Sequence, residues 1–175
     1  MNLPLPAISA TNLQFDIAKG FGMKLLQRMM STQAPGATAL IRLSVGLIFL
    51  TQGILKYADP AWGVLRFTKI GFPFPDFTAH FVGTFEIICG FLVIIGLLTR
   101  ISSVPLLIIN LTAIAATKIP ELFRPEQGFW FMVSDARTDF AMLMGIVFLI
   151  IAGSGLWSVD AHLSRSFTVG HRAFE

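Results

Sequence analysis

Charged residues are scarce in this chain. Of its 175 residues only 13% are charged, whereas 54% are hydrophobic. Soluble domains carry about 25% charged residues, so the chain has roughly half of the usual polar coat. A mean hydropathy of +0.73 agrees with this count. The composition argues against a water-soluble fold, and the scattered basic residues argue against a nucleic-acid-binding surface.

Cysteine is almost absent as well. Cys89 is the single cysteine, which excludes an intramolecular disulfide, a CxxC redox pair and a zinc site made of paired cysteines. The sequence also lacks a phosphate-binding glycine loop, an HExxH motif, a dinucleotide-binding glycine pattern and facing histidines for haem. We therefore predict no self-sufficient catalytic motif, no metal site and no covalently bound cofactor.

Long hydrophobic stretches, in contrast, are abundant. Four of them have 17–20 residues each: Ala37–Leu55, Ala79–Leu98, Ile101–Thr117 and Phe140–Trp157. At 1.5 Å per residue such lengths roughly match the ~30 Å hydrocarbon core of a bilayer. The predicted fold is an all-α membrane protein, an antiparallel bundle of four transmembrane helices within residues 37–163. Little more than Thr99 and Arg100 separates the second and third stretches, which predicts a tight helical hairpin.

The segments outside these stretches are expected to lie at the membrane surface. Within residues 1–36, apolar side chains repeat at helical spacing from Phe15 to Met29, which predicts an interfacial amphipathic helix; a loosely ordered tail is the alternative. The links 56–78 and 118–139 are rich in proline, glycine and aromatics, so they are either short re-entrant or interfacial stretches or ordinary loops. Residues 164–175 form a C-terminal tail.

The distribution of lysine and arginine predicts the orientation only weakly. The basic residues before the first stretch and Arg100 in the tight turn lie on the same side of the predicted bundle. The positive-inside rule assigns that side to the cytoplasm. We therefore expect a multi-pass membrane protein with both termini in the cytoplasm.

Ionisable residues at membrane depth are the candidate functional residues, because they are costly there unless they serve a purpose. In an antiparallel bundle they form two groups. The outer cluster, at the end of the bundle away from the cytoplasm, contains Gln52, Lys56, Glu86, Lys118 and Asp139. The inner cluster, at the cytoplasmic end, contains Arg42, Arg100 and Asp160. In the fourth stretch, Asp139, Ile146, Gly153 and Asp160 follow one another at intervals of seven, which predicts one stripe on one helix.

Glu86 stands out in the outer cluster, because it lies about seven residues, or ~10 Å, inside its stretch. A carboxylate at that depth needs a partner, and Lys56 at the end of the neighbouring helix is the preferred one. Two interpretations remain open: the pair only fixes the register of the helices, or it belongs to a ligand site. The inner cluster is interpreted as structural, anchoring helix ends.

Three segments resemble the DoxX family of small bacterial four-helix membrane proteins. They are IRLSVGLIFLTQGILKY at 41–57, GTFEIICGFLVIIGLLTR at 83–100 and GSGLWSVDAHL at 153–163. The resemblance covers about 37–163, and the positions that match the family pattern are Arg42, Lys56, Glu86, Arg100 and Asp160. Some members, such as the DoxD subunit, belong to a thiosulfate:quinone oxidoreductase, and a mycobacterial relative is implicated in a membrane-associated oxidoreductase complex.

The resemblance implies a membrane subunit or accessory of a quinone-linked redox complex, in contact with lipid and with other membrane subunits or further copies. In this hypothesis Glu86 accepts a proton during quinol oxidation, and Lys56 or Gln52 donates a hydrogen bond to a quinone carbonyl. Lys118 and Asp139 complete the expected quinone or lipid site. The alternative is a purely structural or assembly subunit with no catalytic role.

Overall fold

The structure is a computed structural model that describes residues 34–123 and 128–164, and within them every regular element is a helix. The predicted amphipathic helix of the N-terminal segment lies outside the described residues. So does all of the predicted C-terminal tail except Ser164.

The described chain contains three long helices with shorter helices between and after them. The elements are α2 (Thr38–Ala58), α3 (Val64–Ile70), α4 (Pro75–Ile95), α5 (Thr99–Ala113), the π-helix η1 (Ile114–Lys118), α6 (Ile119–Leu122), α7 (Gly128–Asp135) and α8 (Arg137–Ala152). Residues 159–164 are also helical. Because η1 joins α5 to α6 without interruption, these three elements form one continuous helix.

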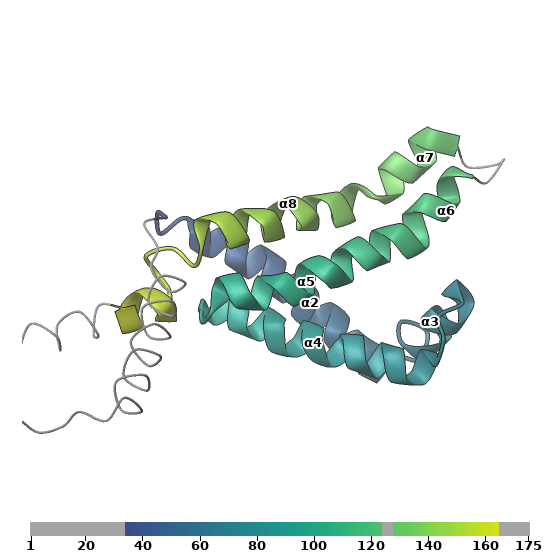
Figure 1. The fold of residues 1–175 in the computed structure, drawn as a ribbon, viewed down its shortest axis with the longest axis horizontal. Coiled ribbons are helices and arrows are strands. Elements are labelled where there is room, and N and C mark those ends of the chain that lie inside the picture. Colours follow the sequence, from purple (N-terminus) through teal and green to yellow (C-terminus); the bar gives the residue numbers. More distant parts are fainter. Residues whose placement is uncertain (1–33, 124–127, 165–175) are drawn as a thin grey trace, which may run out of the picture.

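The helices pack in a closed order at one end of the molecule. α2 packs along α4, α4 packs against α5, α5 packs against α8, and α8 returns to α2. Figure 1 shows the helices converging at the end with the α4–α5 turn and diverging toward the end with α3, α6 and α7. The converging and diverging ends correspond to the predicted inner and outer ends of the bundle.

Two pairs of glycines bring α2 and α4 into backbone contact. A Cβ atom on Gly46 would lie 2.8 Å from the carbonyl oxygen of Gly90, and a Cβ atom on Gly53 would lie 2.8 Å from that of Gly83. Any larger residue would push the helices apart, so these glycines set both the closeness and the register of the pair. The glycines of α2 and α4 therefore face the interior of the bundle.

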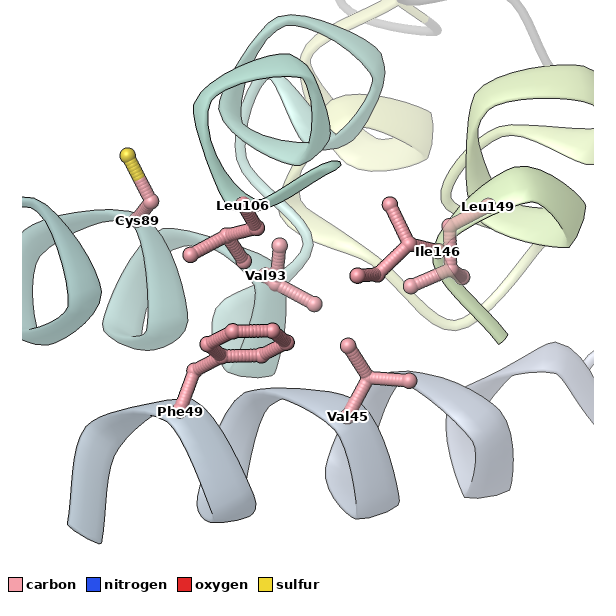
Figure 2. Close-up of a cluster of buried hydrophobic side chains, with 7 residues drawn as sticks. All are labelled: Val45, Phe49, Cys89, Val93, Leu106, Ile146 and Leu149. Carbon is pink, nitrogen blue, oxygen red and sulfur yellow. The ribbon is translucent and has the colours of Figure 1, made fainter. Parts of the chain in front are cut away.

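The hydrophobic core lies where α2, α4, α5 and α8 approach one another. Figure 2 shows its side chains converging from α2, α4, α5 and α8; they are Val45, Phe49, Cys89, Val93, Leu106, Ile146 and Leu149. Many large apolar side chains outside this core are exposed, among them Leu40, Ile108 and Ile151. An apolar exterior around a small core is what a lipid environment requires, because lipid solvates such side chains.

Three of the four predicted spans have the length and composition of membrane-crossing helices: Thr38–Ala58, Pro75–Ile95 and Thr99–Glu121. The fourth prediction, Phe140–Trp157, differs from the structure. α8 begins earlier, at Arg137, and ends at Ala152, because Gly153 adopts a φ of 82°. Its 16 residues give a length of about 24 Å.

The two long links contain short helices. α3 lies in the first link and packs against α4, whereas α6 and α7 lie in the second. Both links therefore place helical segments near the outer ends of the long helices.

The π-helix η1 widens the turns just before α6. Such π-bulges frequently mark functional sites.

Candidate functional site: an apolar pocket with a buried ion pair

The predicted pair between α2 and α4 is present. The Lys56 ammonium lies 2.5 Å from Oε2 of Glu86, and the two side chains are only 11% and 5% exposed. Both ions are therefore removed from solvent, and each compensates for the desolvation of the other.

Glu86 lies deeper than the sequence indicated. Since α4 begins at Pro75 rather than at Ala79, Glu86 is its twelfth residue and lies about 16 Å from the helix start. Lys56, by contrast, belongs to the last turn of α2. Its side chain nevertheless turns inward to Glu86 instead of reaching the nearby end of the helix. A lysine in this position normally extends toward the interface, so the inward position indicates a specific attraction to Glu86.

The ion pair forms part of the wall of a pocket of about 340 Å³. One side of the pocket consists of α2, α3 and α4, and the other of α5, η1 and α8. Its wall is mainly apolar, with Phe49, Phe67, Phe72, Phe81, Ile109 and Met142 among the lining residues. Size and composition both match small-molecule sites, which are concave, largely apolar and equipped with a few polar groups.

The polar groups of the wall come from both sides of the pocket. They are Gln52, Lys56, Arg66, Glu86, Asn110, Thr138 and Asp139, with further threonines at positions 78, 112 and 117. Asn110 is buried and its amide nitrogen donates a hydrogen bond to the backbone oxygen of Asp139 at 3.1 Å, which ties α5 to the first turn of α8.

Lys118 lies at the end of η1 and does not line the pocket. Its ammonium pairs with the carboxylate of Asp135 and lies 3.7 Å from Oδ2 of Asp139. The structure thus divides the outer cluster into two parts: Gln52, Lys56 and Glu86 on one side, and Lys118 and Asp139 on the other. All except Lys118 line one pocket.

Sequence reasoning missed the residues that α3 contributes. Arg66 lines the pocket, and its guanidinium lies 5.7 Å from the ring centroid of Trp62, in the range of a cation–π contact. The spacing of four between Trp62 and Arg66 was the available signal, because it puts both side chains on one face if the link is helical. Asp135 was also missed, because α7 could not be located from the sequence.

In the inner cluster, Asp160 caps the start of α5. Its Oδ1 accepts the N–H of Leu98 at 2.8 Å, and its Oδ2 accepts the N–H of Thr99 at 3.3 Å. Leu98 has a left-handed φ of 50°, which is uncommon for a non-glycine residue. The buried carboxylate therefore holds a strained turn and satisfies N–H groups that a helix start leaves without partners.

The two arginines of the inner cluster bind backbone oxygens near the C-terminus of the described chain. Arg42 donates to the carbonyl oxygen of Trp157 at 2.5 Å, and Arg100 donates to that of Ile151 at 3.2 Å. The predicted single stripe on the fourth span is wrong, since the helix ends before Gly153 and Asp160 belongs to the following segment.

Two curated proteins resemble this chain over most of their length. The "Uncharacterized membrane protein Rv3486" of Mycobacterium tuberculosis is 45% identical over 146 residues, which cover 81% of this chain and 90% of that protein. The "Putative oxidoreductase CatD" of Bacillus subtilis is 32% identical over 123 residues, 70% of this chain and 84% of that protein. The DoxX family matches residues 37–119.

The chain belongs to the DoxX family. The family match includes α2 and α4 with the Lys56–Glu86 pair, and it ends just after η1. No solved structure matches the chain. Together with the three membrane-crossing helices, the relationship makes this DoxX-family chain a multi-pass membrane protein.

Proposed function

We propose that this DoxX-family protein is the membrane subunit or accessory of a redox complex and that its pocket binds a quinone headgroup. One observation carries the proposal: a buried lysine–glutamate pair lies in the wall of an apolar pocket of about 340 Å³. Ionisable residues at this depth usually mark substrate or proton pathways. A pair that served only to hold two helices together would not need an adjoining pocket.

The residues of the pocket fit the chemistry of a quinone. A quinone ring is flat and apolar and carries carbonyl oxygens that accept hydrogen bonds. Phe49, Phe67 and Phe81 offer apolar surface for the ring. The Lys56 ammonium and the Gln52 amide are donors for a carbonyl oxygen.

Glu86 is the group that would handle the proton. When a quinol is oxidised, each hydroxyl loses a proton, its C–O bond becomes a carbonyl bond, and two electrons leave the ring in total. The Glu86 carboxylate accepts one of the two protons in this scheme, and Lys56 keeps the carboxylate in place for it. The other proton is released to water. The two electrons pass to a redox centre of a partner subunit, so the proposal includes such a partner in the membrane. The Bacillus subtilis relative is named an oxidoreductase, which supports a redox role but not a particular substrate.

The same proposal places four crossings in a bacterial inner membrane, with both termini in the cytoplasm. The length of α8, about 24 Å, is short for a crossing. The segment that follows it to Trp157, GSGLW, carries no charge and lengthens the crossing without extending the helix. The outer cluster, with the Lys56–Glu86 pair, then lies toward the side opposite the cytoplasm.

The test uses the Glu86→Gln variant, which keeps the shape of the side chain and removes the proton acceptor. We expect the purified wild-type protein, reconstituted in nanodiscs, to bind menaquinone or ubiquinone, and the variant complex in native membranes to lose most of its quinol oxidation. Quinone binding and turnover that are both unchanged in the variant would contradict the proposal. Stoichiometric protein partners without any bound quinone would instead favour a structural subunit.

A further inference from the structure

We propose that the pocket selects a ring ligand that carries a negative charge, with Arg66 as the residue that recognises the charge. The inference rests on the proposed function, since it assumes that a quinone-like ring enters the pocket. It goes further by assigning the class of ring, an acidic one, and the position of its anionic oxygen.

The starting point is that Arg66 forms no ion pair of its own in the described part of the chain: Glu86, the carboxylate that its charge acts on, is already paired with Lys56. The ion pairs formed within residues 34–123 and 128–164 are Lys56–Glu86, His80–Asp76 and those of Lys118 with Asp135 and Asp139. Arg66 belongs to none of them. Its guanidinium is held at Trp62 by a cation–π contact, which fixes its position without neutralising its charge.

The position of Arg66 makes this charge relevant to a ligand. Its side chain is half-buried and lines the pocket, whereas Lys69, one turn further along α3, is exposed and does not. A guanidinium at the edge of an apolar cavity interacts more strongly with an anion than one in open water, because the surrounding dielectric constant is lower. Its planar donors also match an anionic oxygen better than an ammonium does.

The charges around the pocket are arranged asymmetrically. On the side formed by α2, α3 and α4, the cations Lys56 and Arg66 face the single carboxylate Glu86, which leaves one positive charge in excess. On the other side, the single cation Lys118 forms ion pairs with two carboxylates, Asp135 and Asp139, which leaves one negative charge in excess. An anionic ring is therefore attracted to the α3 side and repelled from the α8 side, so one orientation is favoured.

The experiment compares two ligands that differ in charge. A hydroxynaphthoquinone is ionised at neutral pH, and its methyl ether is a neutral ring of nearly the same shape. The binding of each is measured by isothermal titration calorimetry to the full chain in nanodiscs of zwitterionic lipid. The variants are Arg66→Met, the charge-conserving Arg66→Lys, and Lys69→Met as the control with the same loss of charge on the same helix.

We expect the preference for the acidic ligand over its ether to fall about fivefold in Arg66→Met, the order of one partly screened charge pair. The preference should remain in Lys69→Met and largely remain in Arg66→Lys. An unchanged preference in Arg66→Met, or an equal fall in Lys69→Met, would overturn the assignment while ether binding still supports the quinone pocket. If neither ring binds the wild type, the proposed function fails together with this inference.

A second arm separates a ring ligand from a lipid headgroup, because a phosphate could occupy the same guanidinium. Phosphatidylglycerol is added to the nanodiscs and the titration with the acidic ligand is repeated. We expect an unchanged affinity, since the apolar pocket contributes to the binding of the ring and not to that of a headgroup. Displacement of the acidic ligand by phosphatidylglycerol would assign Arg66 to a lipid and overturn the proposal.

Discussion

At the scale of single residues, the buried Lys56–Glu86 pair is the feature that most needs an explanation. Two desolvated ions gain from each other little more than their burial costs, so the pair alone adds little stability. Either ion without its partner, however, is strongly unfavourable. A buried pair therefore constrains what may be substituted at either position, and it keeps an ionisable carboxylate in the pocket wall.

The Lys56→Met variant tests this dependence. It should destabilise the protein by about 3–5 kcal/mol, because Glu86 is left without its counter-ion in a buried position. Adding Glu86→Gln to the same chain should restore most of the loss. The measurement is the apparent melting temperature in detergent, with Lys69→Met as the control for the removal of an exposed lysine. A single variant that melts like the wild type would show that the pair is not desolvated.

Asp160 makes the second prediction at this scale. In Asp160→Asn the amide nitrogen replaces one of the two oxygens that accept the N–H groups of Leu98 and Thr99, so one donor loses its acceptor. The loss should resemble that of a helix cap, about 0.5–2 kcal/mol. Asp76→Asn is the matched control, because Asp76 is exposed at the start of α4. Equal melting temperatures for both variants would contradict the capping role.

At the scale of elements, the contact between α2 and α4 organises the molecule. The glycines of the contact place the two backbones against each other, and this close approach puts Lys56 within reach of Glu86. The pocket therefore depends on helix packing at neighbouring positions that carry no polar side chain.

The Gly53→Val variant tests that dependence. The added side chain would meet the carbonyl oxygen of Gly83 and the backbone of Ile87, so α2 must shift. Overpacking of this kind typically costs about 1–3 kcal/mol, and the shift should also weaken ligand binding in the pocket. Ser44→Val on the exposed face of the same helix is the control. Thermal unfolding and ligand titration of both variants give the comparison, and a tolerated Gly53→Val would contradict the packing argument.

The sequence predicts the long helices better than it predicts where they end and how the links between them fold. The long apolar stretches predicted the three helices that are long and apolar enough to cross a membrane, because hydrophobic length is the main signal of such spans. The depth of Glu86 made its pairing with Lys56 predictable. The end of α8 was not predictable in the same way, because Gly153 ends the helix within a stretch that remains apolar. The place of Arg66 depends on how a link folds back over the bundle, and no periodicity in the first two stretches encodes that.

At the scale of the whole molecule, the arrangement predicts which surfaces face which side of the membrane. If α8 crosses, its two ends lie on opposite sides. In a Cys89→Ser background, Ser134→Cys before α8 should react with a membrane-impermeant maleimide applied outside spheroplasts. Trp157→Cys, which replaces a 76% exposed residue after α8, should react only after permeabilisation. Labelling of both positions from the same side would show that α8 does not cross and that only three helices span the membrane.

Two neighbouring alanines of η1 allow a direct test of the proposal that the pocket between the two sides of the bundle binds a quinone. Ala116 lines the pocket, whereas Ala115 is exposed and does not. Quinone is extracted from the wild type, Ala116→Phe and Ala115→Phe after mild-detergent purification from native membranes and is quantified by mass spectrometry. We expect bound quinone in the wild type and in Ala115→Phe. We expect its loss in Ala116→Phe, because the phenyl ring fills part of the pocket. Equal quinone in all three proteins, or none in the wild type, would contradict the proposal.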